Sequence, residues 1–317
     1  MDVVVTGASG YIGGQVALAL CDAGHRVIGI DRRPCAARLK DVFDQFVQAD
    51  FDSDQAKIKL IQVQPGAIIH CAGTSLVGPS VKYPSDYYHN NVIKTIYMLD
   101  LVVHALPKTR VIFSSSASVY GEPILDSCSE VDPCEPISPY GESKRMIEQV
   151  LASYHRAYNL DYVAFRYFNA CGADRQGRHG QAPGASHVIA RILEATRDNK
   201  QFSLYGDDYE TPDGTCVRDY VHVEDIAHAH VCALDTAVLS GVYNLGSNTG
   251  TSVKEILTHA AAIAGSVSVL LEPRRTGDPA VLTASATKFN KLMPNWRQYT
   301  LDDMIQHAWA WYVQKNS

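Results

Sequence analysis

The sequence predicts an α/β fold in which a doubly wound parallel sheet carries helices on both faces. Three observations support this prediction. Short apolar segments alternate with helical segments through the first half of the chain, as in parallel strands joined by crossover helices. Val3–Thr6 is a β-branched run typical of a buried parallel strand. A glycine-rich turn, Gly7–Gly13, and a helical stretch, Gln15–Ala23, follow it directly.

The remaining elements of the first half follow from the same alternation. The two longest helices are expected at Asp86–His104 and Tyr140–Tyr158. The strands are expected at Val3–Thr6, Val27–Ile30, Phe46–Gln48, Ala67–His70, Val111–Phe113 and Tyr162–Tyr167. In open α/β sheets, ligands bind at the carboxyl ends of the strands. The residues expected at those ends are Gly7, Asp31, Asp50, Cys71 and Ser114.

From Asn169 onward the strand–helix pattern breaks. Residues 172–186 are rich in glycine and charge, which predicts a long loop, and a helix is expected at His187–Arg197. A chain of 317 residues also exceeds a typical single core. We therefore expect a dinucleotide-binding domain at residues 1–168 and a smaller, interleaved α/β substrate-binding lobe at 169–317. A segment near 214–246 is expected to return to the first domain.

Composition excludes several classes of protein. Hydrophobic residues make up 46% and charged residues 20%, as in soluble globular proteins, and the net charge of −6 disfavours nucleic acid as a partner. No apolar stretch reaches transmembrane length, and a strand from Val3 leaves no room for a signal peptide, so we expect a cytoplasmic location and no membrane partner.

The eight cysteines lack a C-x-x-C spacing and are expected to be free thiols. No metal site is expected, because His222, His228 and His230 lack completing ligands.

The glycine-rich turn predicts a dinucleotide site of the Rossmann type. Glycines between a strand and a helix let backbone N–H groups approach a pyrophosphate at the helix N-terminus. Asp31 follows the second strand, at the distance expected of a residue that binds the adenine ribose. Its carboxylate favours NAD over NADP, since it repels a 2′-phosphate. Arg32 and Arg33 weaken that preference, because either can pair with a phosphate.

A second motif predicts proton transfer from an alcohol. Tyr140 and Lys144 are four residues apart and share one face of a helix. An ammonium group beside a phenol lowers the phenol's pKa, so Tyr140 is expected to take a proton near neutral pH. Ser116, which follows an apolar run, is placed to share the same hydroxyl. Taken alone, Tyr140 could be a core tyrosine and Lys144 a solvent-exposed helix residue. In a chain that also carries a nucleotide-binding turn, the pair indicates oxidation of an alcohol.

Together these motifs resemble the extended short-chain dehydrogenase/reductases, and within them the UDP-glucose 4-epimerases. The resemblance covers almost the whole chain, and the glycine turn and the Tyr/Lys pair mark only the superfamily. The stretches that narrow it to the epimerases are Tyr205–Tyr209 and Thr211–Val223. Further matching stretches are His70–Gly73, Tyr87–Val92, Phe113–Gly121, Ser138–Lys144, Arg166–Asn169, Tyr243–Ser247 and Arg274–Pro279.

The resemblance implies NAD-dependent epimerisation at C4 of a UDP-hexose through a transient 4-keto sugar. It implies that Ser116, Tyr140 and Lys144 are catalytic. It also implies that the 4-keto sugar rotates about its link to the diphosphate between two hydride transfers and so presents its other face. The implied NAD-binding residues are Gly7, Gly10, Tyr11, Ile12, Gly13, Asp31, Asp50, Phe51, Cys71, Ala72, Gly73, Asn91, Ser114, Tyr140, Lys144 and Tyr167. The implied UDP-sugar residues are Ser116, Tyr140, Asn169, Ser203, Tyr205, Arg218, Tyr220, Arg275 and Asp278.

Four residues differ from those that the resemblance leads us to expect. Ser75 stands where many relatives carry a lysine near the pyrophosphate, and Arg32 and Arg33 stand where an asparagine commonly follows the acid. We hypothesise that one of these arginines partly restores the missing charge. Leu282 matches a position whose volume limits the C2 substituent of the sugar. Leucine is intermediate in size, so UDP-N-acetylhexosamines stay open as substrates.

The sequence also bears on three functions other than epimerisation. A 4,6-dehydratase needs an acid and a base next to the serine position, and Ala117 and Ser118 supply neither. A UDP-glucuronate decarboxylase stays open as another enzyme of the same superfamily. A non-catalytic NAD-sensing protein is disfavoured, because the Tyr140/Lys144 pair is kept. The resemblance also implies a homodimer that pairs through the helices expected at Asp86–His104 and Tyr140–Tyr158.

Overall fold

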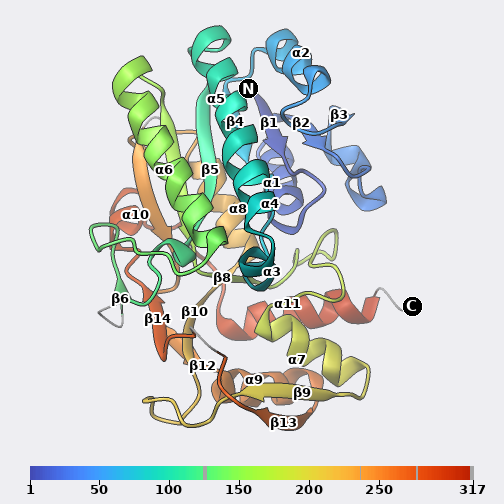
Figure 1. Ribbon diagram of the computed structural model, residues 1–317. Helices are drawn as coiled ribbons and strands as arrows, with labels where there is room; N and C mark the ends of the chain where they lie inside the picture. The colour runs from blue at the N-terminus through green and yellow to red at the C-terminus, as the bar shows by residue number, and fades with distance from the viewer. Residues whose placement is uncertain (124–126, 236, 276–277, 315–317) are drawn as a thin grey trace.

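The computed structural model describes residues 1–123, 127–235, 237–275 and 278–314. Thr276 and Gly277 of the stretch Arg274–Pro279 therefore lie outside the described residues. A seven-stranded sheet in the order β11-β7-β5-β4-β1-β2-β3 forms the upper part of the molecule in Figure 1. Every neighbouring pair in it is parallel. Its strands are β1 (Asp2–Thr6), β2 (Arg26–Asp31), β3 (Gln45–Gln48), β4 (Ala67–His70), β5 (Arg110–Ser116), β7 (Tyr162–Tyr167) and β11 (Gly241–Leu245).

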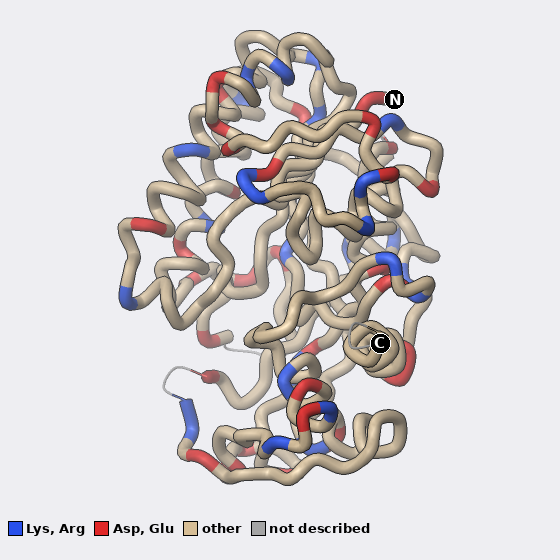
Figure 2. The backbone as a smooth tube through the Cα atoms, turned by 90° about the vertical axis from the view of Figure 1, so that its right-hand side faces the viewer, with Lys and Arg blue, Asp and Glu red and all other residues tan. Residues whose placement is uncertain are grey.

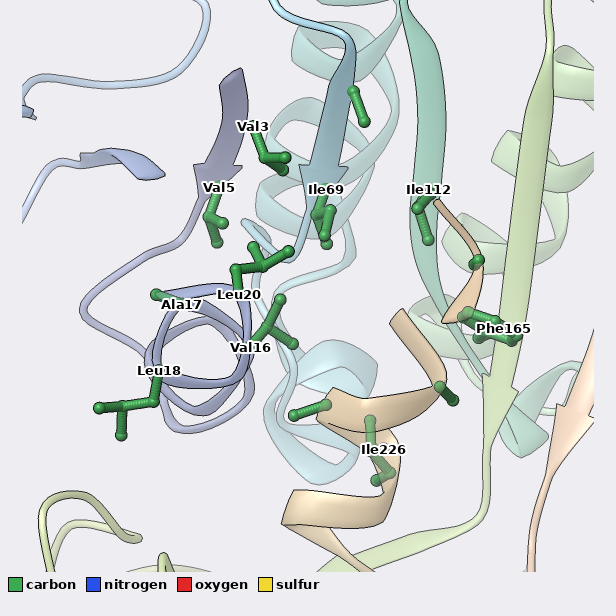
Figure 3. Close-up of a cluster of buried hydrophobic side chains, with 14 of the residues drawn as sticks. Val3, Val5, Val16, Ala17, Leu18, Leu20, Ile69, Ile112, Phe165 and Ile226 are labelled. Atoms are coloured by element: carbon green, nitrogen blue, oxygen red, sulfur yellow. The ribbon is translucent and has the colours of Figure 1, made fainter. Parts of the chain in front are cut away.

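Helices cover both faces of this sheet because its strands are apolar on both sides. Val3 and Val5 face α1 (Tyr11–Asp22) and α8 (Val223–Cys232) and pack with Val16 and Ile226 (Figure 3). Val4, between them, faces the other way into a second cluster under α2 (Asp54–Val63), α5 (Lys94–Ala105) and α6 (Pro139–Tyr158). The predicted α/β class with a doubly wound parallel sheet is confirmed.

A smaller part lies below the sheet in Figure 1 and has its own core. It contains a sheet in the order β12-β10-β14-β6, with β8 paired to β10, and a separate β13-β9 pair. Its strands are β6 (Ser127–Cys128), β8 (Asn169–Cys171), β9 (Gln201–Tyr205), β10 (Val217–His222), β12 (Gly250–Ser252), β13 (Ser268–Glu272) and β14 (Val281–Ala284). Its helices are α7 (Val188–Arg197), α9 (Val253–Ala264) and α11 (Leu301–Gln314).

The chain passes between the two parts more than once. After β10 it returns through α8 to β11, which pairs with β7 at one edge of the large sheet. The domain boundaries expected from the sequence stay a prediction. Acidic and basic residues are interspersed along the chain in both parts (Figure 2). No helix among the described residues is long and apolar enough to cross a membrane.

The helix expected at Asp86–His104 is in fact three segments. They are α4 (Pro84–Tyr87), a π-helical segment η2 (Tyr88–Ile93) and α5. Asn91 lies in the π segment, is buried, and donates to Ser143 Oγ at 3.0 Å and to the Thr74 carbonyl at 2.9 Å. π-helical turns occur frequently at functional sites, so the π segment supports a functional role for Asn91. Short elements elsewhere are η1 (Ala37–Val42), α3 (Val77–Lys82), η3 (Ala117–Val119) and α10 (Thr287–Leu292).

A buried ion pair ties α6 to the sheet. Arg166 of β7 binds both carboxylate oxygens of Glu148, at 2.9 and 2.7 Å, and both side chains are 2% exposed. Glu148 also accepts a 2.6 Å hydrogen bond from Ser115 of β5. The remaining donors of Arg166 include Nη1, which donates to Tyr120 Oη at 2.9 Å. A buried pair is stable only when its partners are satisfied in this way.

Arg166→Met is expected to destabilise the protein by about 3–5 kcal/mol, because it leaves the Glu148 charge buried without its partner. Urea unfolding measures this change. The matched control is Lys57→Met, which breaks the exposed 3.6 Å pair with Asp54 and should change stability by no more than about 0.5 kcal/mol. A loss below about 1 kcal/mol for Arg166→Met would show that the pair does not hold α6.

Candidate functional site

The glycine-rich turn between β1 and α1 is shaped for close approach. A Cβ on Gly13 would stand 2.2 Å from the Gly7 carbonyl oxygen, so no larger residue fits there. Helix α1 begins at Tyr11, four residues earlier than expected, and its N-cap residue Gly10 has no capping side chain. The N–H groups of the first turn, which include those of Tyr11 and Ile12, are therefore left for a ligand. The turn fits the pyrophosphate of a dinucleotide.

Asp31 ends β2 beside this turn and is 6% exposed. Its carboxylate accepts hydrogen bonds from the backbone N–H groups of Ser9, at 3.0 Å, and Arg33, at 2.8 Å. The Arg33 guanidinium lies 3.4 Å from the same carboxylate. It also reaches over the turn, with Nη2 3.4 Å from the place that a Cβ on Gly10 would occupy. Both arginine side chains are exposed. Arg33 is the one that reaches over the glycine-rich turn, where the pyrophosphate is predicted to lie.

Two further predicted cofactor residues follow β3. Asp50 binds Lys94 Nζ at 2.6 Å, and its other oxygen accepts from the Phe51 N–H at 2.9 Å. Phe51 is 7% exposed and packs edge-on against His70, with ring centroids 4.8 Å apart. Sequence reasoning missed Lys94, which has no motif of its own around it. Contact of Asp50 and Phe51 with an adenine stays a prediction.

The segment after β4 lies against the carboxyl end of β1. The Cys71 N–H donates to the Thr6 carbonyl at 3.2 Å, and the Ala72 N–H lies 3.4 Å from Thr6 Oγ1. Asn91 Oδ1 accepts from the Thr74 N–H at 2.7 Å, which fixes the chain just past Gly73. Burial raises the pKa of Cys71 to about 11, so this thiol stays protonated. The structure thus places Cys71–Gly73 and Asn91 together, next to the glycine-rich turn.

The predicted catalytic residues meet where α6 begins. Ser138 caps α6 by accepting from the Gly141 N–H at 3.2 Å, and Pro139 occupies its first turn. A Cβ on Gly141 would stand 2.4 Å from the Ser118 carbonyl oxygen. This close contact brings the helix onto the segment that carries Ser116, at the carboxyl end of β5.

Lys144 is 6% exposed and faces the sheet. Its Nζ donates to the Ser114 carbonyl at 2.7 Å and lies 4.8 Å from the Phe113 ring centre and 5.8 Å from that of Tyr140. Burial lowers the pKa of Lys144 to about 8, despite the opposing effects of Cys71 and Glu148. The site therefore holds a cation that is easily neutralised.

The expectation that Tyr140 has a pKa below its usual value is wrong for the polypeptide by itself. Burial raises the pKa of Tyr140, and the hydrogen bond with Ser116 lowers it by less. Lys144 is bound to the Ser114 carbonyl and stands beside the ring of Tyr140, so its charge does not outweigh the cost of burying a phenolate. Residue spacing alone could not reveal this balance, because it depends on desolvation.

The predicted sugar-nucleotide residues lie mainly on β8, β9 and β10. Arg218 donates from Nη2 to Asp278 Oδ1 at 2.8 Å, and Asn169 Nδ2 donates to the Asp219 carbonyl at 2.8 Å. The Arg275 guanidinium lies 3.8 Å from the centre of the Tyr205 ring and lowers the pKa of that tyrosine. The other two predicted residues are Ser203, which pairs with Leu270 of β13, and Tyr220, which is buried beside Asn169.

A hollow of about 540 Å³ opens next to Arg275 and Asp278. Sequence reasoning assigned no role to Tyr209 and Arg274, which also line it. The Arg274 guanidinium lies 4.4 Å from the centre of the Tyr209 ring, and the buried hydroxyl of Tyr209 has no hydrogen-bond partner among the described residues. Both belong to stretches that carry the family resemblance, so that signal was present in the sequence.

The catalytic and sugar-nucleotide residues are linked through β14. Leu282 pairs in register with Arg218 and packs against the cluster of Ala117, Val119 and Phe168 beside Ser116.

The three histidines that the sequence offers as candidate metal ligands each contact other groups. They are His222, 3.0 Å from His307, His228, 2.9 Å from the Trp296 carbonyl, and His230, 2.7 Å from Tyr167. All eight cysteines are free thiols.

Comparison with known proteins agrees with this geometry. The UDP-glucose 4-epimerase of Halalkalibacterium halodurans is 41% identical, over 99% of this chain and 96% of that protein. UDP-glucose-4-epimerase from Stenotrophomonas maltophila, solved with bound NAD and formylated UDP-arabinopyranose, matches over 100% of both chains with a TM-score of 0.94 and 32% identity. The enzyme from Bifidobacterium longum, solved with NAD+ and UDP, matches over 100% of this chain and 99% of that chain with a TM-score of 0.92 and 34% identity.

The family model described as the NAD dependent epimerase/dehydratase family matches residues 3–246, which include all of the predicted cofactor and catalytic residues. The structural matches extend beyond this range, through the part of the chain that carries Arg275 and Asp278. The chain therefore belongs to the NAD dependent epimerase/dehydratase family, as its resemblance to the UDP-glucose 4-epimerases predicted.

Proposed function

We propose that the protein is an NAD-dependent isomerase that inverts C4 of a UDP-hexose, with UDP-glucose and UDP-galactose as its substrate pair. The observation that carries this proposal is the meeting of Ser116, Tyr140 and Lys144 at the end of β5, beside the nucleotide-binding turn. The end-to-end similarity to UDP-glucose 4-epimerases supports it.

The chain's own residues supply the proton chemistry. Tyr140, held by the start of α6, removes the proton of the sugar 4-hydroxyl and later returns one, while Ser116 shares that hydroxyl. Bound NAD+ would supply the hydride acceptor, and then the hydride donor, for C4. Lys144 lies where it can hold the nicotinamide ribose and lend positive charge to the Tyr140 phenolate. The turn at Gly13 and the Asp31 carboxylate would hold the other end of the cofactor.

The uridine diphosphate is held by side chains of the smaller part. Arg218 and Arg275 each offer a planar fork of donors, which suits phosphate oxygens. Asp278 and Asn169 lie beside them, and Tyr205 provides a flat face for the base. Strong contacts to the diphosphate leave the hexose free to present either face to the cofactor, as inversion at C4 requires.

Leu282 supports UDP-N-acetylhexosamines as a second substrate class. It is only partly buried and stands between Arg218 and the segment after Ser116, next to the place of the sugar. A leucine there leaves more room for a C2 substituent than a large aromatic residue. Dehydratase chemistry needs an acid and a base next to Ser116. The residues there are the buried Ala117 and Ser118, whose Oγ accepts a hydrogen bond from Ser116 at 3.1 Å, so this chemistry is disfavoured.

Location and assembly complete the proposal. We infer a cytoplasmic protein, in keeping with its eight free thiols. We also infer a homodimer that pairs through α5 and α6. Ile93 and Tyr97, at and near the start of α5, are 41% and 53% exposed, which is unusual for large apolar side chains on a covered helix.

Purified protein should convert UDP-galactose to UDP-glucose without added oxidant. Tyr140→Phe should lower kcat about 10²–10⁴-fold, because the proton acceptor is lost, while UDP affinity measured by calorimetry stays unchanged. Tyr158→Phe, at the far end of the same helix, is the matched control and should keep full activity. Failure of the unmodified protein to convert any UDP-hexose or UDP-N-acetylhexose would refute the proposed function.

Lys144→Met is expected to stabilise the nucleotide-free protein at pH 7. The folded pKa of about 8 lies below the usual value, so the unfolded chain binds the proton more tightly and the buried charge costs up to about 3 kcal/mol. This cost disappears as pH rises from about 8 to about 10.5, where both states lose the proton. Urea unfolding across this pH range should show the advantage of Lys144→Met fading. An equal difference at both ends would contradict the assignment.

Arg33→Ala is expected to loosen NAD+ about tenfold or more, because it removes a charge-assisted contact at the pyrophosphate position. Arg32→Ala is the matched control and should have a smaller effect, since it removes the same charge one residue away from the side chain that reaches over Gly10. The amount of NAD that stays with each protein through gel filtration measures the difference. Equal retention by all three proteins would show that Arg33 does not offset Ser75.

The proposed dimer predicts a mass of two chains in sedimentation equilibrium. Tyr97→Glu should shift the protein toward the monomer, because it buries a charge in the proposed α5–α6 interface. Ile58→Glu changes a similarly exposed apolar residue on α2 and should leave the mass unaltered. A monomeric unmodified protein, or equal masses for both variants, would count against this interface.

A further inference from the structure

A row of hydrogen-bonded side chains leads from the Lys144 site to helix α8. The Lys144 ammonium binds the Ser114 carbonyl at 2.7 Å. The Ser114 hydroxyl lies 2.9 Å from Tyr167 Oη, which lies 2.7 Å from His230 Nε2. His230 belongs to α8 and was assigned no role in the site. The row therefore joins a helix outside the predicted site to the strand that holds the catalytic lysine.

The hydrogen-bond partners of His230 fix which nitrogen carries its proton. His230 Nδ1 lies 2.8 Å from the Ile226 carbonyl, which can only accept, so Nδ1 carries the hydrogen. Burial lowers the pKa of His230 to about 4, so the ring is neutral and Nε2 has a free lone pair. Tyr167 therefore donates its single phenolic hydrogen to Nε2. The Ser114 hydroxyl then donates to the phenolic oxygen, 2.9 Å away, and accepts from the protonated Cys71 thiol, whose Sγ lies 3.2 Å from Ser114 Oγ.

Packing holds this arrangement rigid. His230 is fully buried, and its ring meets Phe165 edge-on at a centroid distance of 5.1 Å. Tyr167 is the last residue of β7 and lies next to Ser116 across the β5–β7 register. The Nε2 acceptor sets the orientation of the phenolic hydrogen, because turning that hydrogen toward Ser114 would leave the buried Nε2 without a donor. His230 thus determines where Tyr167 points at the edge where the cofactor residues gather.

We propose that His230 is a positioning residue for the nicotinamide end of the cofactor site, acting through Tyr167 and Ser114 on the strand that binds Lys144. This inference rests on the proposed function and adds to it a residue outside the expected catalytic set. His230 touches none of the reacting atoms. Its role is to keep Tyr167 and Ser114 in one arrangement while the site releases and takes up a proton.

Two substitutions separate the hydrogen bond from the volume of the ring. His230→Phe keeps an aromatic ring but removes the Nε2 acceptor, so the Tyr167 hydroxyl must turn its hydrogen toward Ser114 Oγ, 2.9 Å away. His230→Gln places an amide oxygen near the position of Nε2 and can still accept from Tyr167. We expect His230→Phe to speed NAD loss during gel filtration about tenfold and to lower kcat by a similar factor, since Tyr167 and Ser114 lose the hydrogen-bond arrangement that Nε2 imposes. His230→Gln should recover most of both, and UDP affinity should change less than twofold in each variant.

Tyr167→Phe should give the same losses, and adding His230→Phe to it should cost little more, because both act through one contact. The structural control is His228→Phe, which removes a 2.9 Å contact with the Trp296 carbonyl from the same helix. It should lower the melting temperature as much as His230→Phe and leave NAD retention intact.

The proposal is overturned if His230→Phe and His228→Phe lose NAD equally, or if the effects of His230→Phe and Tyr167→Phe add in full. NAD retention is measured on the purified holoenzyme without any sugar substrate. Failure of the unmodified protein to epimerise a UDP-hexose would therefore refute the proposed function without deciding the role of His230.

Discussion

The arrangement of the site depends on one buried ion pair, Glu148 with Arg166. Glu148, Lys144 and Tyr140 are spaced by four residues, so all three lie along one face of α6. Each meets the same strand: Glu148 binds Ser115, Lys144 binds the Ser114 carbonyl, and Tyr140 faces Ser116. Separating a buried charge from its partner costs several kcal/mol, so Arg166 fixes the register of α6 against β5. That register in turn sets the positions of Tyr140 and Lys144.

The sequence was a good guide wherever local signals decide. The strands Ala67–His70 and Tyr162–Tyr167 were predicted with their observed bounds, because a buried parallel strand is an apolar run between breaks. The π segment around Asn91 was missed, since it depends on contacts with Thr74 and Ser143 that come together only in the fold. The predicted lowering of the Tyr140 pKa was wrong for the same reason. Burial of the phenol raises its pKa, and that burial depends on packing in the folded protein.

The two halves of the site differ in how ready they are for a ligand. On the cofactor side, the glycine-rich turn leaves the N–H groups of α1 open, so binding needs little rearrangement of side chains. On the sugar-nucleotide side, Arg218 is paired with Asp278 and Arg275 is stacked on Tyr205. These contacts hold the arginines in place, and a diphosphate must exchange them for its own. Part of its binding energy is therefore used to release the protein's own pairs.

The return of the chain to the large sheet bears on how the protein is synthesised. Strand β11 pairs with β7, yet Val163 and its partner Gly241 are separated by the whole of β8 to α8. Until residue 245 has left the ribosome, β7 is an unprotected border that can pair with another nascent chain. Closing this border needs a long loop to be ordered first, which slows folding. A chain that stops near residue 168, however complete its nucleotide-binding motifs, is therefore prone to aggregate.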